Sequence, residues 1–222
     1  MKPLLLDLFC GAGGCSVGYA RAGFDVVGVD IERHPDHPFA MYVADALDVL
    51  DDMLEHGDGT IYDGFDFAAV HASPPCQGYT TMNNRHGSAS PLLISKTRDR
   101  LFWTGRPWVL ENVPGAKRWM LCPTELTGEM FGLGVYRPRL FDASFLLLAP
   151  ARPPRQSEAA AVYGKQDGRR LWTRTDGTEL RVATLERGSE AMGIDWMTWD
   201  ELREAIPPAY TEHIGHQLKA VL

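Results

Sequence analysis

Short apolar runs that lead into polar or glycine-rich stretches recur through the first half of the chain. Residues 3–9, PLLLDLF, run directly into CGAGG, and helical spacing over 14–22 is then followed by the apolar run 24–30, FDVVGVD. Buried parallel strands are almost continuously apolar, whereas an amphipathic helix repeats every three to four residues. The order therefore predicts a strand, a glycine loop, a helix and a second strand.

The same alternation continues less cleanly to residue 114. It predicts a strand and then a helix over 41–54, a strand over 65–75, a helix over 92–105 and a strand over 107–114. Alternating strands and helices favour an α/β fold with a doubly wound, mostly parallel sheet. Ligands of such folds bind at the carboxyl ends of the strands, where Asp30, Cys76 and Glu111 all stand.

The pattern changes after residue 140. Residues 143–186 are rich in Pro, Gly, Arg and Thr, and their hydrophobic positions follow no long periodic pattern. This predicts a small loop-rich insertion with one hairpin that turns at Asp176-Gly177. Helical patterns return over 187–222 in two stretches split by Pro207-Pro208. We therefore expect a main domain over 1–142, the insertion over 143–186, and C-terminal helices over 187–222 that pack back on the main domain.

Composition is that of an ordinary globular protein, with 45% hydrophobic and 23% charged residues in 222. No apolar run is long enough to span a bilayer or to act as a secretory signal, so we expect an intracellular, cytoplasmic protein without a membrane partner. The 4 cysteines form no CxxC pair, which predicts reduced thiols rather than a disulfide framework.

The net charge of −7 hides an uneven distribution. Residues 1–82 carry 3 basic against 13 acidic residues, whereas residues 83–140 carry 9 basic against 4 acidic ones. A basic face for nucleic acid and an ordinary solvated surface both remain open on charge alone. The basic residues of the second segment are Arg85, Lys96, Arg98, Arg100, Arg106, Lys117, Arg118, Arg137 and Arg139.

The hexapeptide SPPCQG, residues 73–78, places a single thiol directly after two prolines. A free cysteine is commonly a small buried hydrophobe, and Cys76 in a rigid turn fits that interpretation. The alternative is a nucleophile held at a strand end, because two prolines restrict the direction in which the thiol can approach a substrate.

The glycine loop and Asp30 indicate a nucleoside ligand. Glycines let a ligand approach the backbone, and an acid about 20 residues further on is placed to accept hydrogen bonds from ribose hydroxyls. The GxGxxG pattern is met only loosely through Gly18, so a cofactor without a pyrophosphate fits at least as well. Asp45 either contacts an adenine amino group or caps a helix over 46–55.

Other polar residues carry weaker signals. Glu111 either bonds neighbouring backbone, which this segment alone favours, or has a raised pKa and donates a proton. Arg137 and Arg139 are spaced to point to one side of a strand.

We expect His34 and His37 to be solvated loop residues and no metal to be bound. Trp172 is either a core residue or a stacking platform for a base.

Taken in order, these segments resemble the DNA cytosine-C5 methyltransferases over nearly the whole chain except about 143–182. The resemblance rests on DLFCGAGGCSVGYARAGF, GVDIE, ADALD, SPPCQG, ENV, YRPRLF, SEAMGIDWMT and AIPPAYTEHIGHQL, which look like that family's motifs in their usual order. The set of PCQ, ENV and RxR after a glycine loop is highly specific, although each motif alone is not.

The resemblance implies a class I, Rossmann-like methyltransferase that uses S-adenosylmethionine and acts on double-stranded DNA. It implies that Cys76 attacks C6 of a flipped cytosine, that Glu111 holds N3 and the exocyclic amine, and that Arg137 and Arg139 support Glu111 and the base carbonyl. The implied cofactor-binding residues are Phe9, Gly11, Gly13, Gly14, Asp30, Ile31, Asp45, Ala46 and Pro75.

The chain departs from the family pattern at several points. Val135 replaces a usual glutamine, GYT follows PCQ, and Glu204 stands where asparagine is common and where a carboxylate would repel that of the cofactor. The recognition segment has only about 40 residues, which predicts a short or degenerate target, or help from a second subunit in a homodimer. The small size also suggests a phage or mobile-element enzyme.

Three other functions remain open from sequence. The first is the same reaction on RNA, because the catalytic residues do not distinguish ribose from deoxyribose. The second is a methylase-like protein that binds DNA without turnover. The third is a nicotinamide-dependent oxidoreductase, which would use the glycine loop and Asp30 but would leave PCQ and ENV unexplained.

Overall fold

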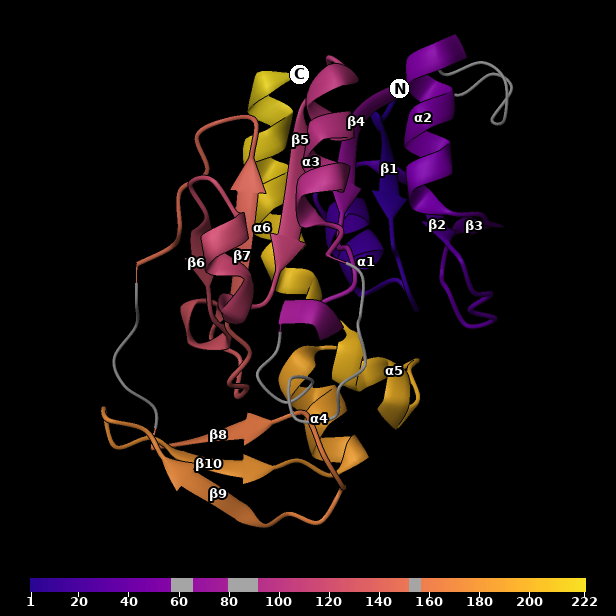
Figure 1. Ribbon diagram of the computed structural model, residues 1–222. Coiled ribbons are helices and arrows are strands. Elements are labelled where there is room, and N and C mark those ends of the chain that lie inside the picture. Colours follow the sequence, from indigo (N-terminus) through magenta and orange to yellow (C-terminus); the bar gives the residue numbers. More distant parts are fainter. Residues whose placement is uncertain (57–65, 80–91, 152–156) are drawn as a thin grey trace.

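The computed structural model describes residues 1–56, 66–79, 92–151 and 157–222 (Figure 1). Within these ranges, a 7-stranded sheet has the order β3-β2-β1-β4-β5-β7-β6. Its strands are β1 (Leu4–Leu8), β2 (Asp25–Asp30), β3 (Ala40–Val43), β4 (Phe67–Ala72), β5 (Trp108–Asn112), β6 (Thr124–Leu126) and β7 (Arg139–Ala143). Every pairing from β3 to β5 is parallel, and β7 runs antiparallel to β5 and to β6. The predicted doubly wound, mostly parallel sheet is confirmed.

The strand register brings the candidate residues to one edge of the sheet. Leu8 of β1 pairs with Val29 of β2 on one side and with Ala72 of β4 on the other, and Ala72 pairs with Leu110 of β5. Asp30, Ser73 and Glu111 therefore follow paired positions on neighbouring strands. The order reverses between β1 and β4, which is where doubly wound folds bind their ligands.

Helices cover both faces of this sheet. They are α1 (Gly14–Arg21) and α6 (Pro208–Leu218) on one face and α2 (Ala46–His56) and α3 (Ile94–Trp103) on the other. Two further helices, α4 (Leu185–Met192) and α5 (Trp199–Glu204), lie outside this sheet. The period-two alternation of β1 divides the core, because Leu6 and Leu8 pack in one cluster with α2 and α3, and Leu5 packs in another with α1 and α6. Asp7 shares the Leu5 face, so this carboxyl group is buried.

Close contact between α1 and α6 depends on glycine. A Cβ atom at Gly18 would lie 2.0 Å from Thr211 Oγ1, and one at Gly215 would lie 2.6 Å from Ala22 Cβ. Gly18, which completes the loose GxGxxG pattern, therefore faces the neighbouring helix. The Thr211 hydroxyl adds a hydrogen bond of 2.9 Å to the carbonyl of Cys15.

Residues 158–182 form a second sheet of 3 strands in the order β8-β10-β9, within the part of the chain that the structure describes. Its strands are β8 (Glu158–Ala161), β9 (Arg170–Thr173) and β10 (Glu179–Val182). The predicted hairpin at Asp176-Gly177 is confirmed: it joins antiparallel β9 and β10, and Gly177 has a φ of 83°. β8, which pairs in parallel with β10, was not predicted.

The C-terminal helices divide between the two sheets. α6 packs against α1, whereas α4 and α5 share a hydrophobic cluster with residues of the small sheet such as Ala160. Where two helical stretches were expected, three occur, because Gly193 ends α4 at a φ of 68° and a capping box of Thr198 and Glu201 begins α5. Figure 1 shows α4, α5 and the small sheet at the end toward which the arrows of β1, β4 and β5 point.

Two further observations bear on the sequence-based expectations. None of the helices formed by the described residues has the length and apolar character needed to cross a bilayer. Thr80 of the GYT departure and Arg85 of the basic segment lie outside the described residues.

Candidate active site

Cys76 follows β4 on a short segment that is tied to the neighbouring strand. The Asn112 side-chain amide donates a 2.9 Å hydrogen bond to the carbonyl of Pro74, and the backbone N–H of Tyr79 donates one of 2.9 Å to the carbonyl of Cys76. A 3₁₀ turn, Gln77–Tyr79, follows directly. These contacts hold the half-buried thiol at the sheet edge.

Burial raises the pKa of the Cys76 thiol above its ordinary value, and the positive charge of Arg139 opposes that rise. The carboxylates of Glu111 and Glu204 act in the same direction as burial, because each would repel a thiolate. The thiol is therefore protonated at neutral pH, and a nearby guanidinium is available to stabilise the thiolate when it forms.

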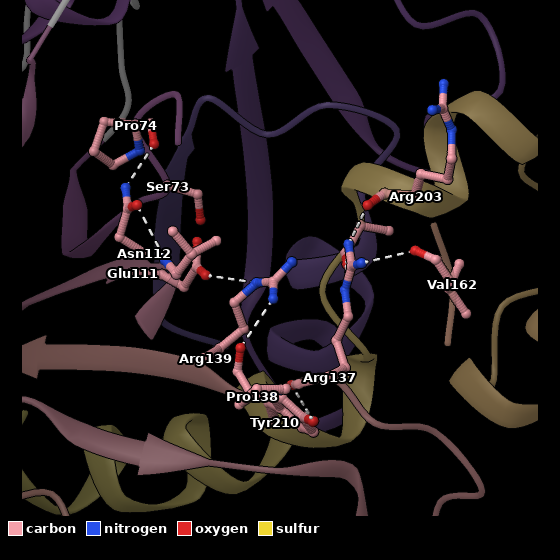
Figure 2. Close-up of polar contacts among 12 residues, drawn as sticks. Ser73, Pro74, Glu111, Asn112, Arg137, Pro138, Arg139, Val162, Arg203 and Tyr210 are labelled. Atoms are coloured by element: carbon pink, nitrogen blue, oxygen red, sulfur yellow. Dashed lines mark hydrogen bonds and ion pairs between the residues drawn. The ribbon is translucent and has the colours of Figure 1, made fainter. Parts of the chain in front are cut away.

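Glu111 lies at the same edge of the sheet, beside Arg139 (Figure 2). Its carboxylate is almost fully buried on β5, and Oε1 lies 3.1 Å from Nε of Arg139 on the antiparallel neighbour β7. Burial raises the pKa of Glu111, while the charges of Arg139 and Arg137 and a hydrogen bond from Ser73 lower it. Oε1 is buried and accepts no well-aligned hydrogen bond from the described residues, so its attraction to Arg139 is chiefly electrostatic.

Arg137 does not share the position of Arg139. Its buried guanidinium donates hydrogen bonds to the carbonyls of Ala205 at 2.8 Å, Val162 at 3.1 Å and Arg203 (Figure 2). Both arginines were expected to support Glu111 and the base carbonyl; Arg139 contacts Glu111 directly, whereas Arg137 acts on it only through its charge. Arg137 precedes β7 and turns toward the segment between α5 and α6, so it ties that segment to the main domain.

A cavity of about 590 Å³ lies beside Cys76, Glu111 and Arg139. Its volume is in the range of small-molecule and cofactor sites. The predicted residues that line it are Phe9, Gly11, Gly14, Asp30, Ile31, Pro75, Cys76, Glu111 and Arg139. Residues from four strand ends, the glycine loop and α5 thus meet around one space.

The glycine loop is shaped by unusual backbone conformations. Phe9 has a φ of 58°, which only a few per cent of non-glycine residues adopt, and Gly11 follows at 49°. The backbone N–H of Gly11 donates a 2.9 Å hydrogen bond to Asp30 Oδ2, and Glu32 N–H donates one of 3.1 Å to Oδ1. Asp30 is thereby fixed at the cavity wall, next to the largely exposed Ile31 side chain.

Three predicted cofactor residues lie outside the cavity lining. Gly13 is the left-handed N-cap of α1, where a Cβ atom would meet Pro38 at 2.8 Å. Asp45 Oδ1 accepts a 2.7 Å hydrogen bond from Leu47 N–H, which agrees with the capping alternative for this residue. Ala46 is the first residue of α2 and is buried in the hydrophobic core.

The two histidines also differ from expectation. His37 is buried rather than solvated, its Nε2 lies 3.2 Å from the Ser16 hydroxyl, and burial lowers its pKa. His34 lines the cavity with its Nδ1 3.6 Å from Glu201. Within the described ranges, no group of three or more His, Cys, Asp and Glu residues is arranged to hold a metal ion.

Several cavity residues were missed by the sequence argument. Met197 and the α5 residues Asp200, Glu201 and Arg203 line the cavity, as does Glu204, which the sequence had marked only as a departure from the family pattern. Because α5 is short and its sequence charged, its pattern resembles a solvated helix. One sequence signal could have indicated that α5 lies at the cavity: the helix is directly followed by AIPP. Ile206 of that segment contacts the glycine loop, because a Cβ atom at Gly14 would lie 2.6 Å from its carbonyl oxygen.

The lining of the cavity is strongly acidic. Its carboxylates outnumber its guanidinium groups, Arg139 and Arg203, and Arg203 is itself paired with Asp200 at 2.6 Å. The carboxylates are Asp30, Glu32, Glu111, Asp200, Glu201 and Glu204. This charge favours a ligand that carries positive charge over one that carries a pyrophosphate.

Comparison with known proteins places these features in a family. Residues 4–116 match the family model described as C-5 cytosine-specific DNA methylase. The matched region includes the glycine loop, Asp30, Cys76 and Glu111.

Two named relatives share part of the chain. The type II methyltransferase M.XorII of Xanthomonas oryzae is 33% identical over 124 residues, which cover 51% of this chain and 29% of that protein. The type II methyltransferase M.AgeI of Thalassovita gelatinovora is 32% identical over 87 residues, covering 36% of this chain and 20% of that protein. The matched segments thus span less than a third of these relatives' own length.

A solved structure matches almost the whole fold. It is described as a DNA modification methyltransferase encoded within a prophage (E. coli), with a TM-score of 0.64 and 15% identity over 99% of each chain. The likeness extends to the small sheet and the C-terminal helices, and it shows a shared fold.

Proposed function

Because the chain belongs to the family of C-5 cytosine-specific DNA methylases, we propose that it transfers a methyl group from S-adenosylmethionine to C5 of cytosine in double-stranded DNA. The observation that carries the proposal is the meeting of Cys76, Glu111 and Arg139 at one rim of the cavity that the glycine loop and Asp30 also line. A nucleophile, an acid and a cofactor cleft within one space are the parts that this transfer requires.

The cavity fits the proposed cofactor in shape and charge. Asp30 is placed to accept hydrogen bonds from ribose hydroxyls, and the exposed Ile31 offers an apolar surface for one face of the adenine. The acidic lining suits the sulfonium and ammonium charges of S-adenosylmethionine and disfavours the anionic pyrophosphate of a nicotinamide dinucleotide. When bound, the cofactor supplies an electrophilic methyl group.

Cys76 begins the proposed reaction by adding its thiolate to C6 of a cytosine flipped into the site. The new C6–S bond makes C5 nucleophilic enough to take the methyl group, with S-adenosylhomocysteine as the leaving group. C5 then gives up its proton to a base, and the C6–S bond breaks to release the Cys76 thiolate. Arg139, whose charge favours the Cys76 thiolate, assists at the first and last of these steps.

Glu111 is proposed to support the same steps. A carboxyl group with a raised pKa can place a proton at N3 of the ring, where negative charge would otherwise develop. Arg139 holds this carboxyl group in place through the 3.1 Å contact to Oε1. We assign no part in the chemistry to Arg137, because its donors are used by backbone carbonyls.

The small sheet is proposed to contact the target DNA. Trp172 on β9 is about half exposed, and Arg169 and Arg170 beside it are largely exposed as well. An exposed aromatic side chain among arginines suits stacking and phosphate contacts. A sheet of this size can contact only a few bases. We therefore expect a short or degenerate target sequence, unless a second copy of the chain contributes further contacts.

Methyl transfer with labelled S-adenosylmethionine tests this proposal directly. We expect label in unmodified duplex DNA at cytosine C5, with sites mapped by bisulfite sequencing, and loss of label in Cys76→Ala. Duplex DNA and tRNA offered in competition separate the DNA reaction from the same reaction on RNA. An absence of label from every cytosine would refute the proposal, and a single fixed site of about six or more base pairs would refute the short target.

A further inference from the structure

Three buried side chains beside the glycine loop form a row of hydrogen bonds that the proposed reaction does not use. The Ser16 hydroxyl on α1 lies 2.5 Å from Asp7 Oδ2 on β1 and 3.2 Å from His37 Nε2 in the loop between β2 and β3. The other ring nitrogen, His37 Nδ1, lies 3.2 Å from the N–H and 3.1 Å from the carbonyl oxygen of Phe39. Ser16 therefore connects a carboxyl group with an imidazole whose second nitrogen has both a donor and an acceptor within reach.

The position of His37 ties this row to the cavity. A Cβ atom at Gly13 would lie 2.9 Å from the His37 ring, and one at Gly28 would lie 2.9 Å from Nε2, so the ring fills the space that these glycines leave. The backbone N–H of His37 donates a 3.1 Å hydrogen bond to the carbonyl of His34, which lines the cavity. A change in the bonds of His37 therefore acts on backbone that borders the cavity.

Two arrangements of hydrogens fit these distances. In the first, an Asp7 carboxylate accepts the Ser16 hydrogen, Ser16 Oγ accepts the Nε2–H of His37, and Nδ1 accepts the N–H of Phe39. In the second, which holds one more proton, a neutral Asp7 donates to Ser16 Oγ, the Ser16 hydrogen points to Nε2, and Nδ1–H donates to the Phe39 carbonyl. The ring is neutral in both and differs in which nitrogen carries its hydrogen.

Burial favours proton uptake at Asp7 rather than at His37. Asp7 is 0% exposed and its Oδ1 has no hydrogen-bond partner among the described residues, so a carboxylate is poorly stabilised there. Burial raises the pKa of Asp7 to about 7 and lowers the pKa of His37. A doubly protonated ring facing an Asp7 carboxylate would hold the same number of protons, but it would place two charges in the interior, which is costly.

We propose that Asp7, Ser16 and His37 act as a proton-coupled switch that sets the tautomer of His37 beside the glycine loop. In the balanced exchange, Nδ1 gains a proton, Nε2 passes its hydrogen to Ser16, and Ser16 passes its own hydrogen to Asp7 Oδ2. His37 then exchanges the N–H of Phe39 for the carbonyl of Phe39, so it is a positioning residue for the backbone next to the cavity. The switch goes beyond the proposed function, because it needs neither cofactor nor DNA.

The charged and titratable groups around the switch define the control that a titration needs. Asp30 and His34, whose side chains lie 4.0 Å apart, both act electrostatically on His37, and Asp30 also acts on Asp7. Ser16→Ala leaves Asp30 and His34 in place while it interrupts the row. Burial raises the pKa values of three neighbours of Asp7, which are therefore neutral near pH 7: Cys10, Cys15 and Tyr19.

The test is a ¹⁵N NMR titration of the histidine rings in the whole chain between pH 5 and pH 8, without DNA or cofactor. The ¹⁵N shifts of Nδ1 and Nε2 report which nitrogen carries hydrogen, and the His37 signals are assigned by their loss in His37→Gln. We expect the Nε2–H tautomer at pH 8 and the Nδ1–H tautomer at pH 5, with a midpoint near the Asp7 pKa of about 7. The Phe39 amide signal should shift with the same midpoint, because its N–H loses the acceptor Nδ1.

Three variants make the result specific. Ser16→Ala should abolish the tautomer change, and Asp7→Asn should hold His37 in one tautomer across the range, because its side chain does not titrate. Cys15→Ala is the matched control, since it removes a neutral neighbour outside the row and should titrate like the wild type.

An unchanged His37 tautomer in the wild-type protein between pH 5 and pH 8 would overturn the proposal. Hydrogen on both ring nitrogens at pH 5 would overturn it as well, because the proton would then reside on His37 rather than on Asp7. A wild-type tautomer change that persists in Ser16→Ala, with the backbone amide spectrum still that of the folded protein, would show that Ser16 does not connect the two groups.

Discussion

Arg139 Nε lies 3.1 Å from Glu111 Oε1, with 12% and 6% of the two side chains exposed. The pair joins β7 to β5, which run antiparallel to each other at the end of an otherwise parallel series of strands. A reversed strand brings residues from its beginning, rather than its end, to the edge at which the parallel strands finish. This reversal is what places an arginine beside a carboxylate at the ligand-binding edge of the sheet.

Replacement of Arg139 by alanine should therefore leave a buried carboxylate without its charge partner. Breaking a buried ion pair in this way typically costs about 3–5 kcal/mol, unless the remaining carboxyl group becomes protonated. We expect a lower free energy of unfolding in urea at pH 8 and a smaller loss at pH 5, where Glu111 can take up a proton. Methyl transfer should fall by about 10²–10³-fold. Equal losses of stability at both pH values would contradict this account.

Arg137 should behave differently although it lies only two residues away. Arg137→Met retains much of the apolar stem but leaves the carbonyls of Ala205, Val162 and Arg203 without their donor. Unpaired buried acceptors cost about 1–3 kcal/mol each, so thermal stability should fall sharply. At a temperature where the variant is folded, ¹³C NMR should find the Glu111 pKa raised by less than in Arg139→Ala. A larger rise in the Arg137 variant would show that its charge, rather than its backbone contacts, matters most.

Gly18 provides a test of the contact between α1 and α6. Gly18→Ala should destabilise the protein by about 1–3 kcal/mol, because the added Cβ atom would meet Thr211 Oγ1 at 2.0 Å and the Pro208 carbonyl at 2.2 Å. Gly134→Ala is the matched control, since the nearest atom to its added Cβ atom is 4.0 Å away. Urea unfolding of both variants measures the difference, and equal stabilities would contradict the close approach of the two helices.

Asp7 makes the stability of the fold depend on pH. Burial raises the pKa of this carboxyl group from 3.8 to about 7, although the Ser16 hydroxyl donates a 2.5 Å hydrogen bond to it. The folded state therefore binds the proton more tightly than the unfolded state does. The stability that this proton contributes is fully present below pH 3.8 and is lost as the pH rises through about 7.

Asp7→Asn removes this titration and isolates its effect. His71 acts in the opposite sense. Because its pKa is lowered in the folded state, the protein loses stability as the pH falls below 6.5 toward about 3. The difference between wild type and Asp7→Asn cancels the His71 contribution. We expect the free energy of unfolding of the variant, relative to wild type, to increase by a few kcal/mol between pH 5 and pH 8. A constant difference across that range would mean that Asp7 is not buried as described.

The parts of the fold that sequence predicted are those encoded by local patterns. Apolar runs and glycine stops identified β1, α1 and β2, and Asp176-Gly177 identified the β9–β10 hairpin. Strand ends then grouped Asp30, Cys76 and Glu111 correctly, because parallel neighbours finish at the same edge. Contacts between distant segments were not encoded locally: nothing in YRPRLF indicates that Arg137 turns toward residues 203–205 while Arg139 turns toward Glu111.

The misjudged residues share a physical cause. His37 follows a polar stretch and was expected to be solvated, yet it is covered by the glycine loop and by Ser16. Gly13 and Gly18 belong to a ligand-binding pattern, yet their missing side chains make room for His37 and for α6. A sequence pattern states which side chains are small or polar, whereas tertiary packing decides whether a ligand or the protein itself fills the space.

Cys76 is proposed to form a covalent bond to C6 of cytosine while Glu111 supports the ring. Duplex DNA containing 5-fluorocytosine tests it most directly, because fluorine at C5 cannot leave as a proton does and the adduct is trapped after methyl transfer. With S-adenosylmethionine, the wild-type protein should give a protein–DNA complex that survives denaturing electrophoresis, Cys76→Ala should give none, and Glu111→Gln should form it far more slowly. A wild-type protein that forms no such complex, or a complex that persists in Cys76→Ala, would contradict the account.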